Sequence, residues 1–117
     1  MLLAPLNHHT HEDVKCLARV LYSEARGESQ RGKLLVAEVV VNRVKDPRWP
    51  NTVCGVTQQK HQFVGKRYNK ELLALSLNIL NGRVELPRTG AVYFNPGSKV
   101  VKTTKLVAKE GGHRFYK

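Results

Sequence analysis

The segment that most constrains the fold of this chain is residues 34–44, which is apolar on nearly every side if it is drawn as a helix. Its β-branched residues would also suit a strand, but the stretch from Ser29 to Val44, about fifteen residues without a turn signal, favours a helix. A helix without a polar face has to be buried. We therefore expect this segment inside the fold, capped at Ser29 and ended by the turn-forming residues 46–51.

Two other helices have clear start and stop signals. Thr10 followed by acidic residues is typical of a helix start, and the apolar stripe that follows predicts a helix from about residue 11 to 26. A further helix is predicted over 69–80, ended by Asn81 and Gly82. In the last third of the chain we expect short strands or extended loops at residues 91–94, 100–101 and 106–108. The predicted fold class is α+β, mainly helical, with short strands in the C-terminal third.

The length of 117 residues fits one domain, with residues 1–10 as a flexible N-terminal segment and residues 11–117 as the folded unit. No apolar run approaches the eighteen or so residues needed to cross a bilayer, so we expect no integral membrane segment. The N-terminal apolar stretch has no basic residue before it and is broken by Pro5, so it does not have the form of a secretory signal.

The charge is strongly uneven. Twenty Lys and Arg against nine Asp and Glu give 20 − 9 = +11. An excess of this size predicts attraction to a polyanion. Nucleic acid, an anionic membrane and the bacterial cell envelope all qualify, and charge alone does not choose among them.

The two cysteines, Cys16 and Cys54, lack the close spacing of zinc sites and redox motifs. We interpret them as two buried small apolar residues, and a single disulfide between the first helix and the loop that follows the second is the alternative. Three histidines lie close together near the N-terminus, where a solvated tail is the simpler interpretation. We therefore expect neither a metal ion nor another cofactor.

Among the nine acids, Glu24 has the most unusual position. It extends the apolar stripe of the first helix, with Leu21 and Val20 one turn before it. It also lies in the last turn before Gly27, where the negative end of the helix dipole opposes ionisation. Burial and dipole both favour the protonated acid, which is the form that general-acid cleavage of a glycosidic bond requires. A salt-bridged glutamate at a helix end is the alternative interpretation.

Two further carboxylates deserve comparison with it. Glu28 precedes the next helix, where a negative charge is stabilised, so it is a candidate second carboxylate. It would equally serve as a capping residue that pairs with Arg26 or Arg31. Glu38 lies within the apolar helix, and we expect it to form a buried pair with an arginine such as Arg43 or Arg26 because a buried charge needs a partner.

Several blocks of the sequence resemble, in the same order, those of the cell-wall hydrolase family of the spore-cortex-lytic enzyme SleB. The most specific is the run from Tyr22 to Glu28, which reads Tyr-Ser-Glu-Ala-Arg-Gly-Glu. The resemblance implies a compact domain similar to lysozyme-like lytic transglycosylases, and it makes Glu24 the catalytic acid. The blocks are residues 16–28, 36–44, 50–56, 62–63, 90–94 and 112–116.

The reaction implied by this resemblance is cleavage of the MurNAc-GlcNAc linkage in the glycan strands of peptidoglycan. In a lytic transglycosylase one carboxyl group serves twice. It first protonates the leaving oxygen, and then as a carboxylate takes the proton from the sugar's own 6-hydroxyl, which closes a 1,6-anhydro ring. A hydrolytic muramidase is the alternative, and it usually needs a second carboxylate or an ordered water. Glu28 could supply that carboxylate only if it faces the cleft.

The matched blocks also contain candidates for sugar binding, which combines flat apolar faces with polar groups. Each has a structural alternative, such as a place in the core for a ring or a bond to a loop carbonyl for the histidine. Val64 and Gly65 stand where the family commonly has Ser-Trp, so one wall of the cleft is expected to differ. The candidates are Gln62, Phe63, Tyr93, Asn95, His113 and Tyr116.

The resemblance also gives the positive charge a partner. Residues 99–117 hold five lysines and one arginine against one glutamate, which is 6 − 1 = +5. We expect a monomer that binds glycan strands and anionic envelope polymers and has no nucleic-acid partner.

Because the sequence has no secretory signal as written, it also fits a phage endolysin, which is held in the host cytosol before it reaches the wall. A bacterial or spore enzyme is the competing source. A small basic nucleic-acid-binding protein is the alternative of another class, although no recognisable motif for that role is present.

Overall fold

The computed structural model of the protein describes residues 9–59, 65–96 and 105–117. Within these ranges helices come first along the chain and strands follow. The elements are α1 (His11–Ala25), α2 (Gln30–Val44), α3 (Val53–Thr57), α4 (Lys70–Leu80), β1 (Tyr93–Pro96), β2 (Leu106–Glu110) and β3 (His113–Tyr116). The α+β class predicted from the sequence is therefore confirmed.

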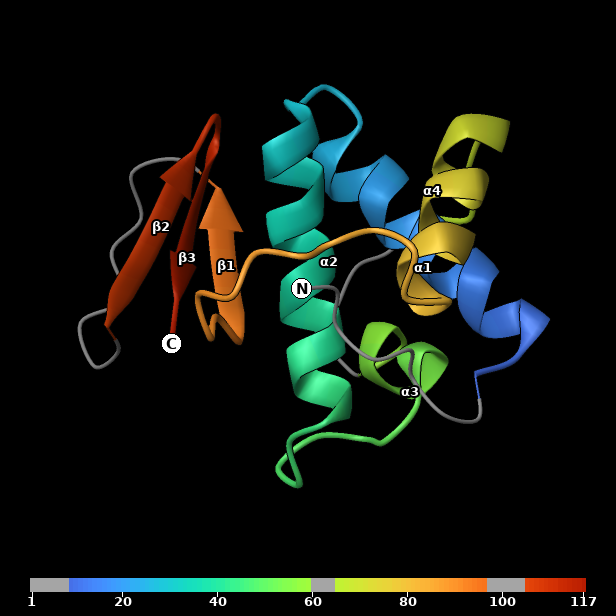
Figure 1. Ribbon diagram of the computed structural model, residues 1–117, viewed down its shortest axis with the longest axis horizontal. Helices are drawn as coiled ribbons and strands as arrows, with labels where there is room; N and C mark the ends of the chain where they lie inside the picture. Colours follow the sequence, from blue (N-terminus) through green and yellow to red (C-terminus); the bar gives the residue numbers. More distant parts are fainter. Residues whose placement is uncertain (1–8, 60–64, 97–104) are drawn as a thin grey trace.

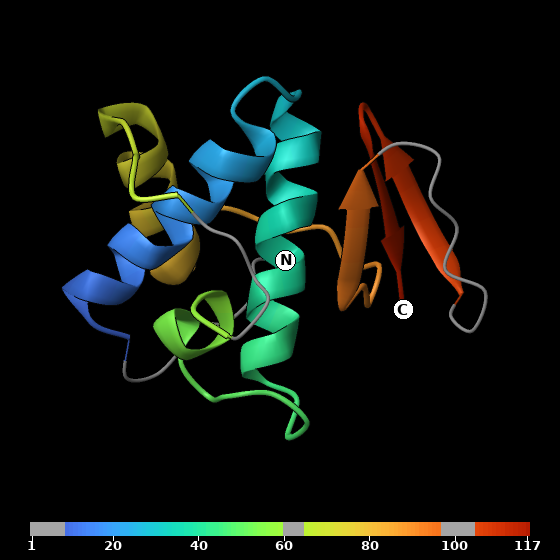
Figure 2. The same ribbon diagram turned by 180° about the vertical axis from the view of Figure 1, so that it is seen from behind.

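The apolar helix α2 lies at the centre of the molecule. Figure 1 shows it standing between the sheet on one side and α1, α3 and α4 on the other, and the view from behind in Figure 2 shows the same order. Its residues Leu35, Val36, Val39 and Val41 are all buried, as a helix without a polar face requires. Ser29 caps it as predicted, because its side chain accepts a hydrogen bond from the backbone N–H of Gly32 at 3.1 Å.

The helix α1 begins with a reciprocal cap. The hydroxyl of Thr10 accepts from the backbone N–H of Asp13, and the Asp13 carboxylate accepts from the backbone N–H of Thr10. The other Asp13 oxygen accepts from the backbone N–H of Cys54 at 3.1 Å, so this buried carboxylate also anchors α3. One face of α1 then packs against α2, α3 and α4.

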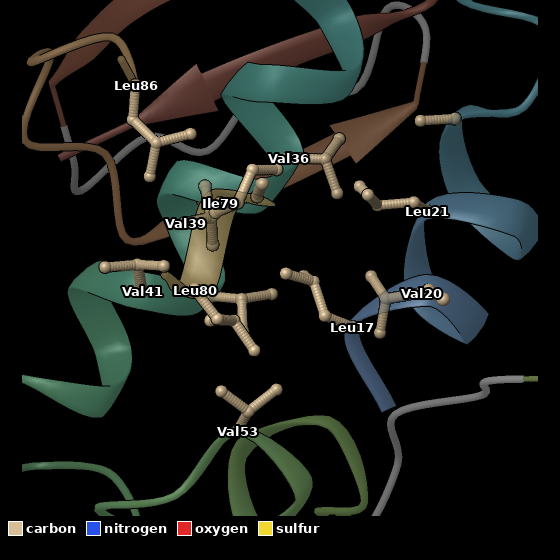
Figure 3. Close-up of a cluster of buried hydrophobic side chains, with 14 of the residues drawn as sticks. Leu17, Val20, Leu21, Val36, Val39, Val41, Val53, Ile79, Leu80 and Leu86 are labelled. Atoms are coloured by element: carbon tan, nitrogen blue, oxygen red, sulfur yellow. The ribbon is translucent and has the colours of Figure 1, made fainter. Parts of the chain in front are cut away.

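The hydrophobic core forms where these four helices meet. Figure 3 shows apolar side chains from each of them converging on one volume. The residues labelled there are Leu17, Val20 and Leu21 of α1, Val36, Val39 and Val41 of α2, Val53 of α3, Ile79 and Leu80 of α4, and Leu86.

The three strands form an antiparallel sheet in the order β1-β3-β2. Phe94 and Phe115 are register partners whose ring centroids lie 6.0 Å apart, and both side chains pack on the helical core. Because side chains alternate along a strand, Asn95 and Arg114 lie on the opposite face of the sheet. His113 shares the core-facing side with Phe115.

Two elements, α3 and β3, were not predicted from the sequence. The helix α3 has five residues, which is too short to show an apolar period, although its Thr52 cap follows the usual rule. The strand β3 mixes charged and aromatic residues and gives no clear alternation. The expected strand at 91–94 begins two residues later at Tyr93, and the one at 106–108 is confirmed. Residues 100–101 and the first eight of the N-terminal segment lie outside the described residues.

The cysteines are joined. Cys16 of α1 and Cys54 of α3 form a disulfide, with their Cα atoms 5.3 Å apart. The interpretation of two unlinked apolar residues was therefore wrong, and the alternative holds. The reason is tertiary, since the packing of α3 on α1 brings the two backbones within the range that a disulfide bridges. In the described part of the chain, no helix is long and apolar enough to cross a membrane.

Candidate active site

Glu24 lies in the last turn of α1, half-buried, where two contacts from distant parts of the chain hold the helix end. His113 Nε2 lies 2.7 Å from the backbone oxygen of Glu24. Because a carbonyl oxygen only accepts, this nitrogen carries the proton and donates it. On the other side, the Ser23 hydroxyl accepts from the backbone N–H of Gly65 at 3.0 Å. The end of α1 that carries Glu24 is thus held by β3 and by the segment that leads to α4.

His113 is almost fully buried, with 6% of its surface exposed. Its ring meets the rings of Phe94 and Phe115 edge-on, at centroid distances of 5.4 and 6.1 Å. Its Nδ1 atom has no hydrogen-bond partner among the residues that the structure describes. The histidine therefore acts on the helix end through its backbone contact, which makes it a positioning residue for Glu24.

Glu28 is engaged by the turn between β2 and β3. Its Oε1 atom accepts from the backbone N–H of Gly112 at 2.8 Å. Gly111 has φ of 55°, and a Cβ atom added there would collide with the Glu28 carboxylate. Pairing with Arg26 or Arg31 was one alternative for Glu28. In the structure Arg31 pairs with Glu110 at 3.6 Å, and the Arg26 guanidinium lies over the Tyr22 ring. Glu28 thus fastens the sheet to the loop between α1 and α2.

Glu38 was expected to pair with an arginine, and this prediction was wrong. The carboxylate is 2% exposed and accepts four hydrogen bonds. They come from the side-chain amide of Asn42 (3.1 Å), the hydroxyl and N–H of Thr89 (2.7 and 2.9 Å) and the N–H of Gly90 (3.0 Å). Neutral donors in this number satisfy a buried carboxylate without a cation. The network ties residues 89–90 to α2 just before β1 begins.

Arg43 has a separate role on the same helix. Its Nε atom donates to the backbone oxygen of Val92 at 2.7 Å, and its guanidinium lies over the rings of Trp49 and Tyr93. Burial lowers the pKa of Arg43 from its usual value, while the nearby Tyr93 acts in the opposite direction. Glu38 and Arg43 together fix the entry of the chain into β1.

Among the predicted sugar-binding residues that the structure describes, one has a hydrogen bond with Glu24. That residue is His113, whereas Tyr93 and Tyr116 pair at the other end of β1 and β3, about 10 Å away at the usual rise per residue. Asn95 lies on the sheet face turned away from the helices. Gln62 and Phe63 lie outside the described residues.

Sequence reasoning missed a pocket of about 360 Å³ beside α1. One wall is the flank of α1 that carries Cys16 and Arg19, and Gly65, the partner of Ser23, lines it as well. The signal for it was the helical spacing of residues 16, 19 and 23, which places them on one side of α1. Its described lining residues are Cys16, Arg19, Thr57, Gln58, Gly65 and Lys66.

Comparison with solved structures identifies the fold as that of a bacterial cortex-lytic catalytic domain. The catalytic domain of the Bacillus cereus SleB protein superposes with a TM-score of 0.79 at 29% identity, covering 97% of this chain and 95% of that one. The catalytic domain of the germination-specific lytic transglycosylase SleB from Bacillus anthracis gives the same score at 30% identity, covering 95% and 98%.

The sequence comparisons give the family. Residues 27–116 match the cell wall hydrolase family, and this chain belongs to it. The spore cortex-lytic enzyme of Bacillus cereus is 33% identical over 95% of this chain but 46% of its own length, so the chain spans about half of that relative. The cell wall hydrolase CwlJ of Bacillus subtilis is 30% identical over 92% of this chain and 86% of its own length. The family match begins three residues after Glu24, whereas the 95% alignment is long enough to include it.

Proposed function

We propose that this protein cleaves the MurNAc-GlcNAc linkages of peptidoglycan, with Glu24 as the acid that protonates the leaving oxygen. The observation that carries the proposal is the placement of Glu24, half-buried at the end of α1 and fixed by His113 and by the Ser23–Gly65 contact. Because the backbone that carries this carboxyl group is held before substrate binds, less ordering is needed to bring the acid to the glycosidic oxygen. Membership of the cell wall hydrolase family supports the same substrate.

We further propose that the reaction is a lytic transglycosylation. Glu24 gives its proton to the glycosidic oxygen and then, as a carboxylate, takes the proton of the 6-hydroxyl that attacks the anomeric carbon. The bond to the leaving sugar breaks, a 1,6-anhydro bond forms, and the acid is regenerated. This scheme needs one carboxyl group, and the second candidate, Glu28, has a structural contact with the backbone N–H of Gly112. One of the similar structures is itself called a lytic transglycosylase.

The test is digestion of purified sacculi by the wild type and by two matched variants. Glu24→Gln removes the transferable proton at nearly constant shape and should lower the rate at least about 100-fold. Glu28→Gln keeps an oxygen that accepts from Gly112 and should remain active. Full activity of Glu24→Gln would overturn the proposal, and tight duplex DNA binding without wall digestion would favour a basic nucleic-acid-binding protein instead.

We propose the cell wall, outside the cytoplasmic membrane, as the place of action. The net charge of +11 favours retention on an anionic and insoluble substrate, and salt should weaken that retention. Delivery as a phage endolysin predicts that cells producing the protein lyse only after their membrane is permeabilised. Lysis without permeabilisation would exclude that route while leaving the chemistry intact.

A further inference from the structure

The pocket beside α1 lies along the same helix as Glu24. Arg19 is five residues before Glu24 and Cys16 is eight before it, which are about 7.5 and 12 Å along a helix axis and about 140° and 80° around it. Gly65 belongs both to the pocket lining and to the Ser23 contact, so the pocket adjoins the proposed site of cleavage. Two to four residues of extended peptide span about 7 to 14 Å. A peptide attached next to the cleaved bond thus has a length comparable to the separation along α1, and it would approach the pocket past Ser23 and Gly65.

The charged groups that line the pocket are cations. Arg19 and Lys66 are present, and no carboxylate is among the described lining residues. The remaining polar side chains there are those of Thr57 and Gln58. The volume of about 360 Å³ lies at the small end of ligand sites. Such a pocket suits a compact anionic group.

Arg19 is also held in place before any ligand arrives. Its Nη1 atom contacts Glu12 Oε1 at 3.3 Å, and its guanidinium lies 5.7 Å from the centre of the Tyr68 ring. A guanidinium has five N–H donors, and the contact with Glu12 uses one of them. The others can receive a carboxylate in the two-pronged geometry that arginine favours. A side chain fixed in this way loses little entropy on binding.

We propose that this pocket binds a carboxylate of the peptide stem that the glycan strand carries beside the cleaved bond. The proposal rests on the proposed function and specifies the substrate further: strands that bear peptides bind better than bare strands. Arg19 supplies the oriented contact, and Lys66 adds a second positive charge at the rim. Phosphate groups of other envelope polymers are the competing anions.

The kinetic test compares peptide-bearing glycan strands with strands from which an amidase has removed the peptides. The wild type should show a lower KM for the peptide-bearing strands, and Arg19→Met should raise that KM about tenfold relative to its KM for bare strands. Lys66→Met should act in the same direction. Lys15→Met is the matched control, because Lys15 is on the same helix and also lies near Glu12 but does not line the pocket.

A binding measurement tests the pocket independently of catalysis. The free stem peptide, titrated into the Glu24→Gln protein, should bind, and Arg19→Met should weaken that binding about tenfold while Arg19→Lys weakens it less. Circular dichroism checks that each variant is folded. Equal effects of Arg19→Met and Lys15→Met, or an effect seen only with phosphate-bearing walls, would overturn the pocket assignment. Peptide binding without any strand cleavage would instead overturn the proposed function alone.

Discussion

Reduction of the Cys16–Cys54 disulfide should cost this small domain a large part of its stability. The bond closes a loop of 38 residues between α1 and α3. For a loop of that length, the loss of chain entropy in the unfolded state is about 13 cal/mol/K, or about 4 kcal/mol at 25 °C. Single domains are commonly stable by only about 5 to 15 kcal/mol. The bond also joins the helix that carries Glu24 to the element beneath it.

The assay is urea unfolding followed by the fluorescence of Trp49, the single tryptophan, whose ring packs edge-on against Tyr93 at 5.7 Å. Wild-type protein should lose about 4 kcal/mol of unfolding free energy when dithiothreitol is added. The double variant Cys16→Ala with Cys54→Ala should be less stable than the oxidised wild type and should not respond to dithiothreitol. This variant is the control for other effects of the reductant.

Two results would refute this reasoning. One is a wild-type unfolding midpoint that dithiothreitol leaves unchanged. The other is the titration of two free thiols in the denatured protein before any reductant is added. Either result would mean that the loop between α1 and α3 is not covalently closed.

Three substitutions test the contacts around the site. Glu38→Ala leaves buried N–H groups without an acceptor and should lower the free energy of unfolding by at least about 2 kcal/mol, whereas Glu38→Gln keeps one acceptor and should cost less in the same urea assay. Gly111→Ala combines positive φ with a collision and should cost more than about 1 kcal/mol, whereas Gly27→Ala, with nothing within 4 Å, should be nearly neutral in thermal unfolding. His113→Ala releases the end of α1 and should lower kcat on sacculi about tenfold or more with little change in KM. Equal costs for each matched pair, or an unchanged kcat, would contradict these assignments.

The long helices could be predicted because their signals are local. Thr10 and Ser29 are predicted caps that the structure confirms, and the apolar stripe or fully apolar run that follows each cap determines what is buried. The helix predicted over 69–80 is confirmed as α4, with Asn69 as its cap. A helix of five residues such as α3 is too short to show the apolar repeat of a helix. The sheet depends on pairing between segments that the sequence does not connect locally.

The candidate site, too, combines a residue that local sequence can indicate with contacts that it cannot. Glu24 was proposed as the acid from its neighbours within α1 and from the resemblance of residues 22–28 to the family. The contacts that hold this helix end and Glu28 come from Gly65, 42 residues from Ser23, and from β3 and its turn, 84 to 89 residues away in the chain. No local pattern predicts such a pairing.

Glu38 illustrates a subtler failure. Because burial of a carboxylate is costly, we correctly expected it to have hydrogen-bonding partners. The sequence did not show which groups these partners are. An asparagine one turn later and two backbone N–H groups provide them, and the arginine on the same helix turns to a carbonyl oxygen instead.

The most direct test of the central claim is mass spectrometry of the fragments released from purified sacculi. If Glu24 acts alone as acid and then base, wild-type protein releases fragments that end in 1,6-anhydro-MurNAc, and Glu24→Gln releases almost none. Fragments with reducing MurNAc ends and no anhydro product would contradict the transglycosylase chemistry. Fragments released by Glu24→Gln at the wild-type rate would contradict the role of Glu24 itself.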